Sequence, residues 1–146
     1  MPTYEQLDAV ADAVNPALLI VTLALPALPL VRNRASPITW YAIVALALAT
    51  TYSLMGLDST FGLWRRFDAD YSAHAAFAMT LVIAWSLIGP RSLAIGSAIV
   101  LMYCALMLHQ RYHSVRDIAS TLLCVILLLG PCVWLVQRRA RRLATR

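Results

Sequence analysis

Residues 115–136, VRDIASTLLCVILLLGPCVWLV, decide the class of fold, because they form a long and largely apolar stretch. The hydrocarbon core of a bilayer is about 30 Å thick and takes roughly 20 apolar residues in a helix. Working back along the chain, four more apolar stretches occupy residues 16–31, 38–55, 72–88 and 92–108. The sequence therefore predicts an all-α polytopic membrane bundle with about five transmembrane helices.

Composition agrees with this class. The chain has 146 residues, of which 61% are hydrophobic and 13% charged, and its mean hydropathy of +0.72 lies outside the range of soluble proteins. We expect one integral membrane domain over residues 1–146. Residues 1–14 form a possible interfacial amphipathic helix, and residues 137–146 a basic cytoplasmic tail. The stretch 16–31 is the least regular span, because Pro26 and Pro29 interrupt it.

The charged residues predict the orientation. If five helices alternate, all seven acids fall on one face together with four arginines. The other face receives no acid and the remaining arginines: Arg32, Arg34, Arg91, Arg138, Arg139, Arg141, Arg142 and Arg146. Positive residues stay in the cytoplasm, so the N-terminus is expected outside and the C-terminus inside. Topology therefore explains the net charge of +5 better than nucleic-acid binding does.

The remaining composition suggests a location. All twelve basic residues are arginine, which is typical of a GC-rich genome, and we expect a bacterial inner (cytoplasmic) membrane. The first fifteen residues carry Glu5, Asp8 and Asp12, unlike the basic start of a signal peptide. The three cysteines lie in apolar stretches without metal-ligand spacing and are interpreted as small buried hydrophobic residues.

The three histidines are predicted to meet at the acid-bearing face. His74 opens the stretch at 72–88, His109 closes the stretch at 92–108, and His113 immediately precedes the stretch at 115–136. Ionisable groups at membrane level are costly, so their convergence favours a functional site.

Two short segments carry chemistry at this face, YSAHAAF at 71–77 and RYHSVRD at 111–117. His113 and Asp117 are four residues apart and can meet on one helical face. A carboxylate fixes the imidazole tautomer and leaves the other ring nitrogen free to attack phosphorus. His74, across the cleft, can protonate the leaving oxygen, while arginines hold the phosphoryl oxygens.

Ser-x-His at 72–74, followed about forty residues later by His-x-x-x-Asp at 113–117, resembles the type 2 phosphatidic acid phosphatase (PAP2) superfamily. This superfamily includes lipid phosphate phosphatases and sphingomyelin and inositol-phosphorylceramide synthases. The resemblance covers residues 58–130 and implies an outward-facing site without metal or cofactor. It implies His113 as the nucleophile through a phosphohistidine, Asp117 as its partner, His74 as general acid and Ser72 as a phosphate contact.

Some positions depart from the family pattern. The family motif Pro-Ser-Gly-His reads Tyr71-Ser72-Ala73-His74, and the expected Ser-Arg before the third motif's histidine reads Leu106-Met107. The phosphate-binding role is therefore assigned to arginines elsewhere on this face. The candidates are Arg111, Arg116, Arg65 and Arg66.

Several readings remain open. The first is a lipid phosphatase acting on phosphatidic acid or a polyprenyl phosphate at the outer leaflet. The second is a headgroup phosphotransferase of the synthase-like branch, and the third a non-catalytic membrane protein or degenerate relative. In the last case His113 and Asp117 form only a local helix-start contact, and the arginines anchor the loops to lipid headgroups.

The expected partners are a lipid phosphate, membrane lipids and a possible second copy of the chain, with no nucleic acid. A channel or transporter is disfavoured, because the stretches lack mid-membrane charges and inverted repeats.

Overall fold

The computed structural model describes residues 3–144, with side chains over residues 3–139. Within that range the chain is helical and contains no strand, which confirms the all-α class. The elements in order are α1 (Tyr4–Ala24), η1 (Leu25–Ala27), α2 (Pro29–Arg32), α3 (Pro37–Phe61), η2 (Arg65–Phe67), α4 (Ala73–Trp85), α5 (Pro90–His109) and α6 (Val115–Ala144).

Four helical segments are long and apolar enough to cross a membrane. They are Tyr4–Ala27, Pro37–Phe61, Pro90–His109 and Val115–Arg139. The stretch predicted at 72–88 instead forms α4, with 13 residues. At 1.5 Å per residue, α4 is about 20 Å long, well short of the hydrocarbon core. It ends early because residues 86–88 fold into a tight turn, in which each amide bonds three residues back, before Pro90 starts α5.

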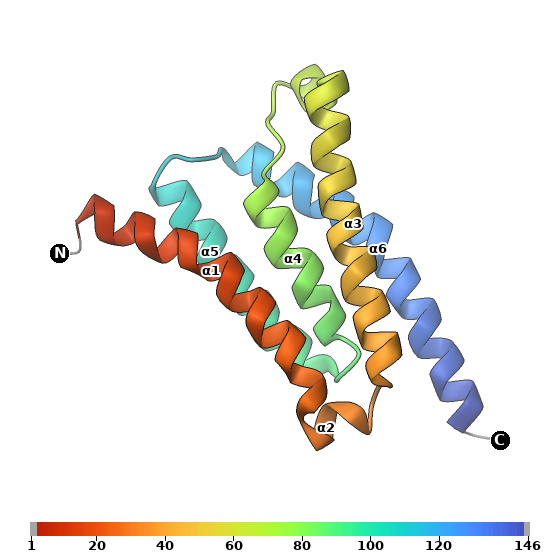
Figure 1. Cartoon of the computed structure of the whole chain (residues 1–146). Helices are drawn as coiled ribbons and strands as arrows, with labels where there is room; N and C mark the ends of the chain where they lie inside the picture. Colours follow the sequence, from red (N-terminus) through yellow and green to blue (C-terminus); the bar gives the residue numbers. More distant parts are fainter. Residues whose placement is uncertain (1–2, 145–146) are drawn as a thin grey trace.

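The short helix α4 lies at the centre of the bundle, packed against α1, α3, α5 and α6 (Figure 1). Nine of its thirteen residues are buried, which suits a helix that is apolar on all sides. Helix α5 approaches it through Gly96, where an added Cβ would lie 2.6 Å from a Val82 methyl group. A glycine is therefore needed for this close approach. The core of the protein is α4 and the helix faces turned toward it.

Helix α1 differs from the prediction. We expected an interfacial helix over 1–14 and a separate span from residue 16, but one helix runs from Tyr4 to Ala24 through Pro16. Thr3 starts it with a capping box to Gln6. The chain then breaks at Pro26 and Pro29 to form η1 and α2. The expected interfacial segment is thus the first half of α1, except for residues 1 and 2, which lie outside the described part.

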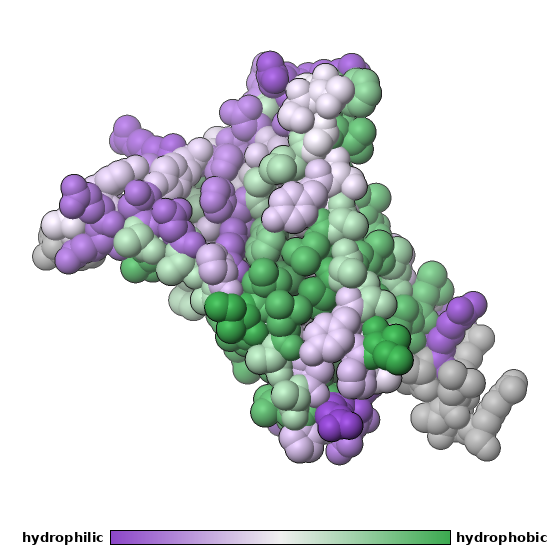
Figure 2. Space-filling view, viewed as in Figure 1, coloured by the Kyte–Doolittle hydropathy of each residue, from purple (hydrophilic) through white to green (hydrophobic). Residues whose placement is uncertain are grey.

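The surface is polar at two ends and apolar between them (Figure 2). Many large apolar side chains are exposed over more than half of their surface, among them Ile20, Leu30, Ile38, Leu101 and Leu127. Such a surface favours contact with lipid over contact with water. We call the end formed by residues 62–72 and 110–114 the histidine end, and the end formed by turns 33–36 and 86–89 the arginine end. The side chains of Arg141, Arg142 and Arg146 lie outside the described side chains.

Candidate functional site

The connection from α3 to α4 places the candidate site below the tip of α3. Helix α3 ends at Gly62, whose φ of 58° is left-handed, and the chain then runs back along the bundle before α4 begins (Figure 1). The Trp64 indole N–H donates to Ser120 Oγ at 3.0 Å, and its ring packs edge-on against Tyr71. Segment 62–72 is therefore fixed against α6, and it positions the start of α4.

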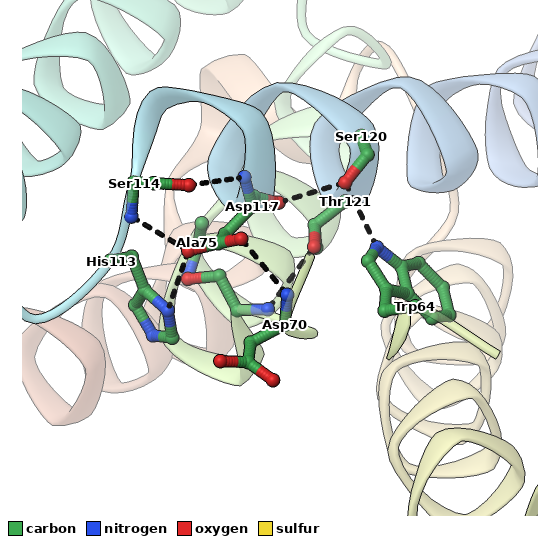
Figure 3. Close-up of polar contacts among 9 residues, drawn as sticks. Trp64, Asp70, Ala75, His113, Ser114, Asp117, Ser120 and Thr121 are labelled. Atoms are coloured by element: carbon green, nitrogen blue, oxygen red, sulfur yellow. Dashed lines mark hydrogen bonds and ion pairs between the residues drawn. The ribbon is translucent and has the colours of Figure 1, made fainter. Parts of the chain in front are cut away.

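Asp117 connects this segment to the start of α6. Its Oδ1 accepts from the Asp70 amide at 2.9 Å, and its Oδ2 accepts from the Ser114 amide at 2.6 Å. The same Oδ2 lies 3.9 Å from His113 Nδ1, an ion-pair distance rather than a hydrogen bond (Figure 3). Ser114 Oγ in return accepts from the Asp117 amide. Asp117 is therefore both a helix cap and the carboxylate nearest to His113.

His74 and His113 line the same cavity, of about 300 Å³, which we call the histidine cavity. They come from the start of α4 and from the turn before α6, segments 39 residues apart in the sequence. The complete lining is Ala11, Asp12, His74, Tyr103, Met107, Tyr112 and His113. The structure thus brings together the two predicted imidazoles, with Asp117 beside one of them.

His74 also lines a second, mostly apolar cavity of about 340 Å³, which we call the α1–α3 slot. Its lining comes from α1, α3 and α4 and includes Leu19, Met55 and Phe77. The two cavities thus adjoin at His74, one with polar side chains and one apolar.

The environment of His113 favours its neutral form. Burial lowers its pKa below the usual 6.5, and nearby His74 lowers it further, while Asp117 and Asp70 act in the opposite direction. At neutral pH the imidazole is therefore uncharged. Asp117 beside Nδ1 favours the tautomer with its proton on that atom, which leaves the Nε2 lone pair free.

Ser72 has a structural role in the described contacts. It is buried, its Oγ accepts from the Ala75 amide at 3.4 Å to cap α4, and its own amide donates to Thr121 Oγ1. It is not among the residues that line the histidine cavity.

None of the four candidate arginines is among the residues that line the histidine cavity. Arg65 lines a separate cavity of about 450 Å³ with Asp70 and Asp117. Arg116 Nη1 lies 3.4 Å from the carbonyls of Phe67 and Asp68, and holds the 62–72 segment. Arg66 and Arg111 are exposed. Asp117 therefore lies between His113 on one side and Arg65 on the other.

The structure adds residues that the sequence analysis did not place in the site, above all Asp12, Tyr103 and Tyr112. The sequence places Asp12 only on the acid-bearing face, because it predicts a separate helix that begins at Pro16. In the structure α1 runs continuously through Pro16, and Asp12 lines the cavity from this helix. Helix α1 also contacts α4 directly, since the Asn15 side-chain amide donates to the His74 carbonyl at 3.4 Å.

No cluster of three or more His, Cys, Asp or Glu side chains able to hold a metal ion occurs within residues 3–139. No protein-family model, no curated protein and no solved structure matches the chain.

Proposed function

We propose that the histidine cavity is the active site of a PAP2-like lipid phosphatase. The substrate is an amphiphilic lipid with a terminal phosphomonoester or diphosphate, of the phosphatidic acid or polyprenyl phosphate type. The observation that carries the proposal is that His74 and His113 line one cavity while Asp117 lies beside His113 Nδ1.

The first step forms a phosphohistidine. The neutral Nε2 of His113 attacks phosphorus, and the bond from phosphorus to the lipid oxygen breaks. Protonated His74 gives its proton to that oxygen, so the lipid leaves as an alcohol from a phosphomonoester and as the lipid monophosphate from a diphosphate. Asp117 stabilises the positive charge that develops on the His113 ring.

The second step restores the enzyme. Neutral His74 takes a proton from water, and the resulting nucleophile attacks the phosphohistidine. The bond between phosphorus and Nε2 breaks, and inorganic phosphate leaves. Each histidine ends in the protonation state in which it began, and the sum of the two steps is hydrolysis.

The phosphate needs a cation near the mouth of the cavity, because the Asp12 carboxylate in the wall repels a dianion. We assign this role to Arg111, which is exposed and precedes the cavity residue Tyr112. Arg116 and Arg65 flank the other side, next to Asp117. Arg66 contributes positive charge on the same segment as Arg65.

The α1–α3 slot supports a lipid as the substrate. It is lined mainly by apolar side chains and shares His74 with the histidine cavity, so a lipid with its hydrocarbon chain in the slot could bring its phosphate to the imidazole pair. The partition of acids and arginines supports an outward-facing site in a bacterial inner membrane.

The test is a phosphate-release assay on purified protein with a panel of lipid phosphates. His113→Asn should lower release by at least about a hundredfold, because the asparagine amide has no nucleophilic nitrogen to attack phosphorus. The matched control is His109→Asn, since His109 is exposed at the end of α5 and lines neither cavity.

The products decide among the alternatives. Phosphate transferred to an added lipid alcohol, in place of free phosphate, would assign the headgroup transferase. Equal activity in the two variants would show that His113 is not the nucleophile. If the protein hydrolyses none of the lipid phosphates in the panel, the non-catalytic reading is favoured.

A further inference from the structure

A second polar cavity lies at the arginine end, far from the histidines. It measures about 400 Å³, and we call it the Arg34 pocket. Three segments distant in sequence form it: the turn before α3, the turn between α4 and α5, and α6. Its polar lining consists of Arg34, Ser36, Thr39, Ser86 and Gln137. The pocket thus offers one permanent cation together with hydroxyl and amide hydrogen-bonding groups.

The charge around the Arg34 pocket is positive. Exposed Arg32, Arg91, Arg138 and Arg139 lie at the same end. The seven acids of the chain all belong to α1, to the C-terminal half of α3, to segment 62–72 or to the start of α6, and none lines the pocket. Helices α3 and α5 begin at this end while α4 ends there, so helix termini contribute partial charges of both signs. The arginines therefore determine which ligands fit, and they favour an anion.

The Arg34 pocket continues into an apolar groove of about 320 Å³ between α4, α5 and α6, which we call the α5–α6 groove. Its walls include Ile83, Leu93, Val133 and Trp134. Ser86 and Gln137 line both cavities, and the Gln137 side-chain amide donates to Ser86 Oγ at 3.0 Å. A polar compartment and an apolar compartment are therefore joined at one hydrogen-bonded pair.

We propose that the Arg34 pocket and the α5–α6 groove together bind one anionic phospholipid. Its phosphate lies against Arg34, with Ser36, Thr39 and Gln137 as further hydrogen-bonding groups, and an acyl chain follows the groove. Basic pockets between membrane helices are suited to anionic headgroups in this way. Neither cavity is lined by His, Cys, Asp or Glu, so this lipid is held and not converted.

Two features favour a lipid over free phosphate as the ligand. A free phosphate would use the pocket alone, and the apolar groove adjoining it would have no role. The pocket also lies among exposed apolar side chains, with Ile38 83% and Trp134 54% exposed, where lipid is the surrounding medium. The site does not depend on the proposed hydrolysis, because no residue of the histidine cavity lines it.

Binding of the headgroup in the Arg34 pocket is tested by thermal unfolding of the full chain in detergent. The added ligands are phosphatidylglycerol, phosphatidylcholine or glycerol 3-phosphate. Phosphatidylglycerol should raise the midpoint most, because a ligand that binds only the folded state stabilises it. Arg34→Gln should raise the phosphatidylglycerol concentration needed for half of this shift by about tenfold. Arg32→Gln removes the same charge from the same end without lining the pocket, and its effect should be much smaller.

Binding of the acyl chain in the α5–α6 groove is tested with Gly130→Leu. An added Cβ at Gly130 meets nothing within 4 Å, so the variant should fold with its side chain in the groove. The variant should raise the phosphatidylglycerol concentration needed for half of the midpoint shift by about tenfold. The shift caused by glycerol 3-phosphate should stay unchanged. Gly56→Leu, at an equally open position in α3, is the control and should behave as the wild type.

Three results would overturn the proposal. One is equal phosphatidylglycerol dependence in Arg34→Gln and Arg32→Gln. Another is wild-type behaviour of Gly130→Leu. The third is an equal midpoint shift from glycerol 3-phosphate at the same concentration, which would reduce the site to one for a free phosphate ester.

Discussion

The two ends of the bundle are built on the same plan but from different side chains. At the histidine end a polar cavity adjoins an apolar slot through His74, and at the arginine end a polar cavity adjoins an apolar groove through Ser86 and Gln137. The first cavity is lined by two imidazoles and a carboxylate, which are side chains that can accept a proton. The second contains a guanidinium, hydroxyls and an amide, which do not accept one near neutral pH. In the two proposals both cavities hold an amphiphile, and their ionisable groups distinguish the site proposed for reaction from the site proposed for binding.

The largest expected effect that separates the two ends is that of His74→Gln. Glutamine cannot deliver a proton to the leaving oxygen, so kcat for phosphate release should fall by about two orders of magnitude. The stabilisation by phosphatidylglycerol should stay at the wild-type value, since His74 does not line the Arg34 pocket. Loss of both properties in a folded variant would mean that the ends are coupled and that the comparison fails.

A smaller effect is expected for Asp117→Asn. The amide keeps one acceptor oxygen for the Asp70 or Ser114 amide and places an NH₂ group against the other. We expect a loss of about 1–2 kcal/mol in the free energy of unfolding, as for a disrupted helix cap. The rate should also fall by about tenfold, because the developing imidazolium loses its nearby negative charge.

These losses are measured by denaturant unfolding and by the rate of phosphate release. Asp8→Asn is the matched control, because Asp8 is a half-buried residue of α1 that lines neither the histidine cavity nor the α1–α3 slot. A variant that loses stability but keeps the full rate would show that Asp117 is a structural cap only.

The smallest effect is expected in the pH dependence. Since burial lowers the His113 pKa, the neutral nucleophile persists below pH 6.5, and the acidic limb of kcat/KM should have its midpoint below that value. Arg34 stays charged throughout, so phosphatidylglycerol binding should be flat over the same range. An acidic limb centred at or above pH 6.5 would contradict the proposed environment of His113.

Stability should change in the same direction. Below pH 6.5 an unfolded chain protonates this histidine while the folded chain resists protonation, so the free energy of unfolding falls as the pH drops through that range. The contribution of His113 to this pH dependence should disappear in His113→Asn, so the difference between the two proteins gives a second measurement of the same pKa shift.

The sequence predicted the class of fold and the pairing of His74 with His113, because both follow from helix lengths and from a residue's place near a helix end. It overestimated the length of α4, since Leu87 and Ile88 are apolar although they belong to the turn that follows this helix. It missed Asp12, because a proline inside a helix is costly in general but was accommodated at position 16. The separation of the arginines from the histidine cavity depends on how exposed side chains pack, which helix spacing alone does not determine.

The shortness of α4 has a consequence for how a lipid would reach the histidines. The central helix begins well below the tip of α3, so the histidine cavity, which His74 lines from the start of α4, also lies below that tip (Figure 1). In the proposed membrane orientation this position would bring the imidazoles closer to the acyl chains of a lipid. In the proposed reaction the substrate would therefore stay seated in its leaflet. Each methylene that remains in the hydrocarbon avoids a cost of about 0.8 kcal/mol on exposure to water, so substrate extraction would not limit the rate.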